Sequence, residues 1–149
     1  MRRSEKILKI KEIFDDVYKD AKCSLDYTKD YELLIAVVLS AQCTDKRVNI
    51  VTKPLFEKYK TLESFAKCDI DELEKMVMPC GFYKTKARNI KALAQKILSE
   101  FDGKIPDTME KLLTLPGVGR KTANLILGDI YNKPALVIDT HAIRLTNRI

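Results

Sequence analysis

The chain has 149 residues, and its 27 Lys and Arg against 21 Asp and Glu give a formal net charge of +6. With 46% hydrophobic and 32% charged residues, the composition excludes a disordered chain, which combines few apolar residues with a large charge imbalance. No apolar run reaches the ~18 residues that a membrane-spanning helix needs. The charged N-terminus lacks the apolar stretch of a signal peptide. We therefore expect a cytoplasmic protein without a membrane partner, whose mild basic excess permits a polyanionic partner.

Apolar residues recur at helical intervals through the first part of the chain. Residues 7–17 carry them at spacings of three and four, which predicts an amphipathic helix. Residues 33–39 are almost continuously apolar, and the helical neighbours favour a buried helix over a buried strand. A further stripe covers 48–59, in which Pro54 should kink or restart the helix because proline lacks an N–H.

Helical signals continue in the second part. Asp69 with Glu72, and Asp107 with Glu110, have the spacing of a capping box, in which two residues satisfy each other's backbone N–H groups. A clean apolar stripe over 90–101 predicts a longer helix. No pair of segments has the pattern of paired strands, so the sequence predicts an all-α fold.

The most informative segment is 115–121, Leu-Pro-Gly-Val-Gly-Arg-Lys, which joins two predicted helices as a helix–hairpin–helix. We expect Gly117 and Gly119 to permit positive φ and close backbone approach. The free N–H groups and the dipole of the following helix form an anion site that suits a nucleic-acid phosphate. A glycine-ended helix followed by a new helix is the alternative, but the whole string favours the hairpin.

Lys121 lies in the first turn of the second helix, where the dipole opposes its charge. We expect a lowered pKa and an amine that attacks a sugar carbon, against the alternative of a solvated lysine. Asp139 is either a helix N-cap or a carboxylate facing Lys121, and its spacing leaves both open. His141, the only histidine, is expected to be structural.

Four motifs in this order resemble the endonuclease III family of helix–hairpin–helix DNA glycosylases. They occupy residues 39–45 (Leu-Ser-Ala-Gln-Cys-Thr-Asp), 81–87 (Gly-Phe-Tyr with Lys-Ala), 115–124 and 137–141 (Val-Ile-Asp-Thr-His). The resemblance implies that Lys121 attacks C1′ of a damaged nucleotide and that Asp139 is the catalytic aspartate. A Schiff base forms, the base leaves, and β-elimination cuts the strand on the 3′ side.

The same resemblance implies DNA-binding roles for four residues. Gln42 matches the residue that fills the space vacated by the flipped nucleotide. Phe82 occupies the position of a leucine that wedges into the duplex in many relatives; the alternative is a core aromatic. Gly117 and Gly119 would place backbone N–H groups on a phosphate, with a monovalent cation on nearby carbonyls.

The implied function is base-excision repair on damaged double-stranded DNA. Adenine-specific relatives usually lack the lysine, so Lys121 points to a bifunctional glycosylase and abasic-site lyase acting on oxidised pyrimidines. We expect a protein that is monomeric on DNA and associated with the nucleoid of a bacterium or archaeon. The alternative is a truncated, catalytically incompetent DNA-binding fragment of such an enzyme.

The sequence departs from the family pattern after the Asp139 motif. Family members continue for several tens of residues, with four closely spaced cysteines that hold a 4Fe-4S cluster. The four cysteines present, Cys23, Cys43, Cys68 and Cys80, have no such spacing. Apart from the monovalent cation at the hairpin, we therefore expect no cofactor and no metal-ligating residues in this chain, and the cluster only in a full-length form.

The resemblance also implies a division of the chain. Residues 1–22 would be a helix of an incomplete second domain, and 23–134 a helical domain with the hairpin motif at about 107–131. Residues 135–149 would begin the truncated second domain. Apolar faces that this domain would cover are expected to be exposed.

Overall fold

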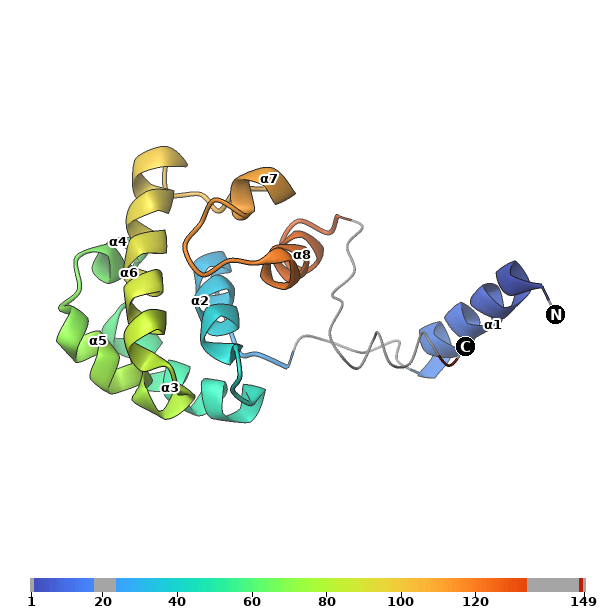
Figure 1. Cartoon of the computed structure of the whole chain (residues 1–149), viewed down its shortest axis with the longest axis horizontal. Helices are drawn as coiled ribbons and strands as arrows, with labels where there is room; N and C mark the ends of the chain where they lie inside the picture. Colours follow the sequence, from blue (N-terminus) through green and yellow to red (C-terminus); the bar gives the residue numbers. More distant parts are fainter. Residues whose placement is uncertain (1, 18–23, 134–147, 149) are drawn as a thin grey trace.

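The computed structural model describes residues 2–17, 24–133 and 148, and every regular element among them is a helix. The helices are α1 (Arg3–Val17), α2 (Asp30–Ser40), α3 (Asp45–Lys58), α4 (Leu62–Ala66), α5 (Ile70–Val77), the 3₁₀ helix η1 (Met78–Cys80), α6 (Tyr83–Glu100), α7 (Met109–Leu112) and α8 (Arg120–Asp129). The predicted all-α fold is thereby confirmed (Figure 1). None of the described helices is both long and apolar enough to cross a membrane.

Helix α2 is the centre of the fold, in contact with α3, α6 and α8 (Figure 1). Its residues 33–39 are all buried, which confirms the helix predicted from the continuous apolar run. Glu32 is also buried, and its carboxylate accepts hydrogen bonds from the Thr28 N–H at 2.8 Å and the Lys29 N–H at 3.2 Å. A buried carboxylate is tolerated here because backbone donors satisfy it.

Helix α6 is the longest described helix and packs against α2, α4 and α5. The predicted stripe is buried, with Ile90, Leu93 and Ile97 fully inside. Gly103 has φ of +77°, and its N–H donates to the Ile97 carbonyl at 3.0 Å. This glycine cap satisfies a carbonyl of the last turn and ends the helix close to where the sequence predicts.

Helices α3 and α7 differ from the predictions in detail. Helix α3 runs continuously from Asp45 to Lys58 through Pro54, so the proline does not restart it. Pro54 and Ile50, whose carbonyl loses its partner, both lie on the exposed face of the helix, where such a carbonyl is tolerated best. Thr108 rather than Asp107 caps α7, because its Oγ1 accepts the Lys111 N–H at 3.4 Å.

Helix α1 forms as predicted, but none of its residues is buried. Five of its apolar side chains are more than half exposed, with Leu8 at 61% and Val17 at 62%, while Ile10 is partly exposed. Within the described part of the chain, the apolar stripe of α1 is therefore uncovered, as the sequence analysis expects.

Candidate nucleic-acid interface and active site

The hairpin between α7 and α8 has the geometry of a tight reversal. Gly117 has φ of +76°, as expected, whereas Gly119 is extended with φ of −101° and caps α8. The expectation of positive φ at Gly119 is therefore wrong. Leu115 and Val118 are buried, and the Val118 N–H donates to the Leu115 carbonyl at 3.2 Å. The turn is thus anchored by apolar side chains while both glycines face solvent.

Both the positive φ and the close approach of Asn89 require glycine at position 117. A Cβ at this position would lie 3.0 Å from both Cβ and Nδ2 of Asn89 on α6. A Cβ at Gly119 would meet nothing within 4 Å. Of the two hairpin glycines, only Gly117 lies close to α6, and the absence of a side chain there permits that approach.

Gln42 and Phe82 occupy two loops that face the same space. Both have left-handed backbone angles, with φ of +52° and +46°. Phe82 is 68% exposed, which rules out the alternative that it is a core aromatic. Together with Gly117 these residues line one cavity of about 270 Å³, whose other lining residues are Val38, Ala41, Thr85, Lys86 and Asn89. Three of the four predicted DNA-binding residues are thus brought to one place.

Lys121 is the second residue of α8 and is exposed to solvent. No side chain caps the N-terminus of α8, so its first N–H groups have no side-chain acceptor. Lys121 does not line the cavity of Gln42 and Phe82. Asp139 and His141 lie outside the described residues, so the approach of Asp139 to Lys121 stays a prediction.

Lys86 is the site residue to which the sequence analysis gives no role. It is 5% exposed, and its Nζ donates to the carbonyls of Leu39 at 2.9 Å, Ala41 at 2.7 Å and Cys80 at 2.9 Å. The signal was present in the sequence, because Lys86 falls on the same helical face as Ile90, Leu93 and Ile97. A lysine on an otherwise buried stripe indicates an ammonium that must find acceptors.

The described cysteines are free thiols. Cys43, Cys68 and Cys80 are free, and Cys80 and Cys68 are buried. Burial, reinforced by the neighbouring Cys43, raises the pKa of the Cys80 thiol to about 11. Among the described residues, no three His, Cys, Asp or Glu side chains are grouped to hold a metal ion. The described cysteines therefore do not fit a 4Fe-4S cluster.

Cys80 predicts a specific loss of stability at high pH. An unfolded thiol ionises near pH 9, whereas the folded thiol stays neutral to about pH 11. The unfolded state thus loses its proton first, and the free energy of unfolding should fall as pH rises through this window. Urea denaturation from pH 8 to 11 should show a shallower decline in Cys80→Ala than in the parent protein. Identical slopes would contradict the assignment.

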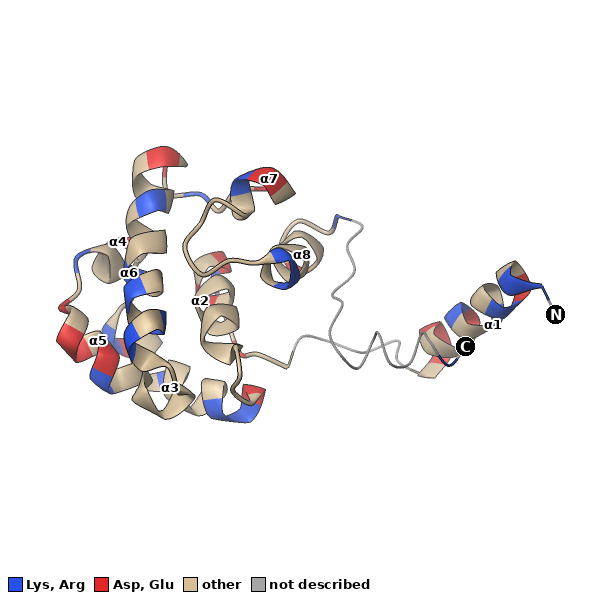
Figure 2. Cartoon of the chain, viewed as in Figure 1, with Lys and Arg blue, Asp and Glu red and all other residues tan. Residues whose placement is uncertain are grey.

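Basic and acidic side chains are unevenly distributed over the helices. Lys and Arg recur along α6 and at the start of α8, whereas Asp and Glu gather on α5 (Figure 2). Helix α6 also supplies Lys86 and Asn89 to the cavity, and α8 carries Lys121. Positive charge therefore accompanies the elements that form the candidate site, as a polyanion-binding surface requires.

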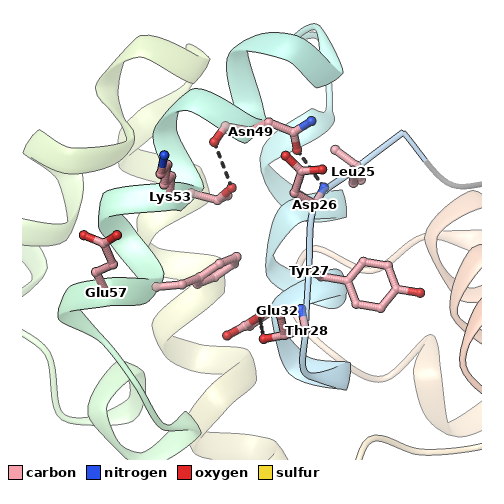
Figure 3. A pocket seen from close by; sticks show the side chains of 10 residues that line it. Leu25, Asp26, Tyr27, Thr28, Glu32, Asn49, Lys53 and Glu57 are labelled. Carbon is pink, nitrogen blue, oxygen red and sulfur yellow. Dashed lines mark hydrogen bonds between the residues drawn. The ribbon is translucent and has the colours of Figure 1, made fainter.

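A second cavity of about 510 Å³ lies between residues 25–28 and α3 and contains none of the predicted site residues (Figure 3). Asn49 holds the entering chain there, accepting from the Asp26 N–H at 2.8 Å and donating to the Ser24 carbonyl at 2.9 Å. These contacts fix the path of the chain into α2.

Comparison with known proteins relates this geometry to a family. The model of the HhH-GPD superfamily base excision DNA repair proteins matches residues 35–149. The chain belongs to this superfamily. The match includes the Gln42 and Phe82 loops and the whole hairpin, so the cavity of the candidate site is built from the HhH-GPD part of the chain.

Individual relatives of this HhH-GPD chain are named endonuclease III. The chain is 47% identical to endonuclease III of Synechocystis sp. over 138 residues, which cover 92% of this chain and 63% of the relative. It is 42% identical to endonuclease III of Bacillus subtilis, covering 90% and 61%. The chain therefore spans less than two thirds of the length of these curated relatives. A trapped covalent endonuclease III–DNA intermediate superimposes with a TM-score of 0.91 at 42% identity, covering 98% of this chain and 68% of that one.

Proposed function

We propose that this chain forms the DNA-binding and catalytic core of a base-excision DNA glycosylase with abasic-site lyase activity. Its substrates are oxidised pyrimidines in double-stranded DNA. The observation that carries the proposal is the convergence of Gln42, Phe82 and Gly117 on one cavity, at the start of the hairpin that leads to Lys121. The similarity to a covalently trapped endonuclease III–DNA complex supports the same conclusion.

Each part of the site has a role in taking a nucleotide out of the stack. The Phe82 ring, exposed at the tip of its loop, enters the duplex as a wedge. Gln42 fills the space that the flipped nucleotide leaves. The unpaired N–H groups at the start of α8, beside Gly117 and Gly119, bind a phosphate and fix the strand.

Lys121 then performs the chemistry on the extruded nucleotide. Its unprotonated Nζ attacks C1′, and the bond from C1′ to the base breaks, so the base leaves with the electron pair and takes up a proton. The nitrogen then loses a proton and the C1′–O4′ bond breaks, with O4′ taking up a proton, so that the sugar ring opens to a Schiff base. The Schiff base acidifies the C2′ proton, whose loss expels the 3′ phosphate by β-elimination. Asp139 assists by accepting a proton or by stabilising positive charge on the sugar.

Borohydride trapping tests this proposal directly. The 149-residue chain is incubated with a duplex that carries one abasic site, and borohydride reduces any Schiff base to a stable protein–DNA adduct. An adduct supports the lyase. Salt-sensitive duplex binding without an adduct would overturn the catalytic part and leave the DNA-binding fragment as the function.

Gln42→Ala should weaken binding to damaged duplex more than to undamaged duplex. The side chain has a partner only after a nucleotide has left the stack, so its removal costs about 1–3 kcal/mol in the damaged complex alone. Fluorescence anisotropy with a matched pair of duplexes, one carrying a stable abasic analogue, measures both affinities. If both fall by the same factor, Gln42 is structural.

A further inference from the structure

The Lys86 ammonium joins the two loops that carry Gln42 and Phe82. Its three protons go to three carbonyls, at 2.9, 2.7 and 2.9 Å, so every donor is used. Leu39 and Ala41 belong to the end of α2 and the Gln42 loop, while Cys80 ends the turn that precedes Phe82. A single buried side chain thus connects segments that are about forty residues apart in the sequence.

A cation suits this position for a physical reason. The last carbonyls of α2 have no partner within the helix and form the negative end of its dipole. Among the described residues, no carboxylate forms an ion pair with Lys86. Backbone carbonyls alone therefore compensate the ammonium, and their positions are fixed by it in return.

The two loops that Lys86 joins are both strained. Gln42 follows directly on Ala41, and Phe82 lies two residues after Cys80. Each has φ in the left-handed region, with +52° and +46°. Non-glycine residues persist there only when their surroundings hold them in place, and such positions are typical of functional sites. Lys86 supplies that restraint to both loops at once.

We propose that Lys86 is a positioning residue that sets the separation of Gln42 and Phe82 and thereby lets them act as one unit in nucleotide extrusion. This inference rests on the proposed function. Lys86 itself touches neither base nor sugar; it acts through the two side chains that it holds at the cavity. Loss of the ammonium should therefore reduce discrimination for damaged DNA without a matching loss of affinity for undamaged duplex.

Lys86→Met tests the proposal, because methionine fills the space of the side chain without donors. We expect the ratio of affinities for abasic-analogue and undamaged duplex to fall about tenfold, since small displacements of positioned groups have large effects. Lys84→Met removes the same charge from the exposed face of the same helix end and should weaken both duplexes alike. Equal effects of the two variants on the ratio would overturn the proposal.

Amide hydrogen exchange provides a readout that does not need DNA. The Cys43 N–H donates to the Ser40 carbonyl and the Gly81 N–H to the Met78 carbonyl, both at 3.1 Å, so each loop contains a reporter. Both amides should exchange faster in Lys86→Met, and neither in Lys84→Met, while the buried turns of α6 keep their protection. If only one loop or neither responds, Lys86 does not couple them, whatever the DNA results.

A double-mutant cycle decides the question if Lys86→Met does not fold. Gln42→Ala and Phe82→Ala are made singly and together in the chain that retains Lys86, and the discrimination ratio is measured for each. If the loops are coupled, the discrimination ratio of the double variant should fall by much less than the product of the two fold-decreases in the single variants. A double variant that loses the full product would overturn the proposal. A parent chain without any preference for damaged duplex would instead refute the proposed function.

Discussion

Lys121→Ala is expected to abolish the covalent adduct and lower strand cleavage by about 10³-fold or more, because the variant lacks the attacking amine. Duplex affinity should stay within about threefold, since backbone N–H groups rather than this side chain hold the phosphate. Lys121 is exposed on the first turn of α8, so the unfolding free energy should change by less than about 0.5 kcal/mol. Trapping yield and anisotropy, measured on the same samples, separate chemistry from binding.

Lys111→Ala is the matched control for this experiment. Lys111 is exposed on α7, the other helix of the hairpin, and its loss changes the net charge by the same amount. Its adduct yield at saturating duplex should equal that of the parent chain. A Lys121 variant that loses binding as severely as cleavage would contradict the division between a backbone phosphate site and a side-chain nucleophile.

Gly117→Ala is expected to lower the unfolding free energy by about 2 kcal/mol and to weaken duplex binding. The φ of +76° costs an L-residue roughly 1–2 kcal/mol. The new Cβ would also lie 3.0 Å from Asn89, so Asn89 or the turn must shift. Urea denaturation measures the first effect, and anisotropy with undamaged duplex measures the second, because a shifted turn no longer presents its N–H groups to a phosphate.

Two variants separate the causes of this loss. Gly119→Ala meets no neighbour and has an extended backbone, so its stability should change by less than about 1 kcal/mol. Adding Asn89→Ala to Gly117→Ala removes atoms from the collision and should recover part of the stability, while the backbone strain remains. A Gly119 variant as unstable as the Gly117 variant would show that the hairpin does not depend on close approach to α6.

Helix positions were predictable wherever one local signal dominated. The continuous apolar run of residues 33–39 predicts burial, and the predicted stripe over 90–101 ends next to Gly103, whose positive φ ends α6. Pro54 does not restart α3, because a missing N–H is most harmful where the freed carbonyl has no water; Pro54 and Ile50 are exposed, and exposure is a tertiary property. At α7, Asp107 and Thr108 are adjacent capping residues, and spacing alone chose the wrong one.

The site was predictable in its residue types but not in its assembly. Motifs indicated Gln42, Phe82 and Gly117 separately, yet only the fold shows that they line one cavity. The exposure of Phe82 was open because a phenylalanine is equally acceptable in a core. The position of Lys86 on the buried stripe predicts its burial, but not its partners, because these are backbone carbonyls, which have no residue identity for a sequence pattern to reveal.

Gln42 and Phe82, both in the left-handed region, have side chains that suit the proposed site and backbone angles that cost stability. Glycine would adopt either backbone angle at about 1–2 kcal/mol lower cost. Backbone strain alone would therefore favour glycine at both positions. The chain instead carries a long amide and a large exposed ring there. Glycine substitutions that raise the melting temperature at these two positions are therefore expected to lower the discrimination for damaged duplex that is proposed above.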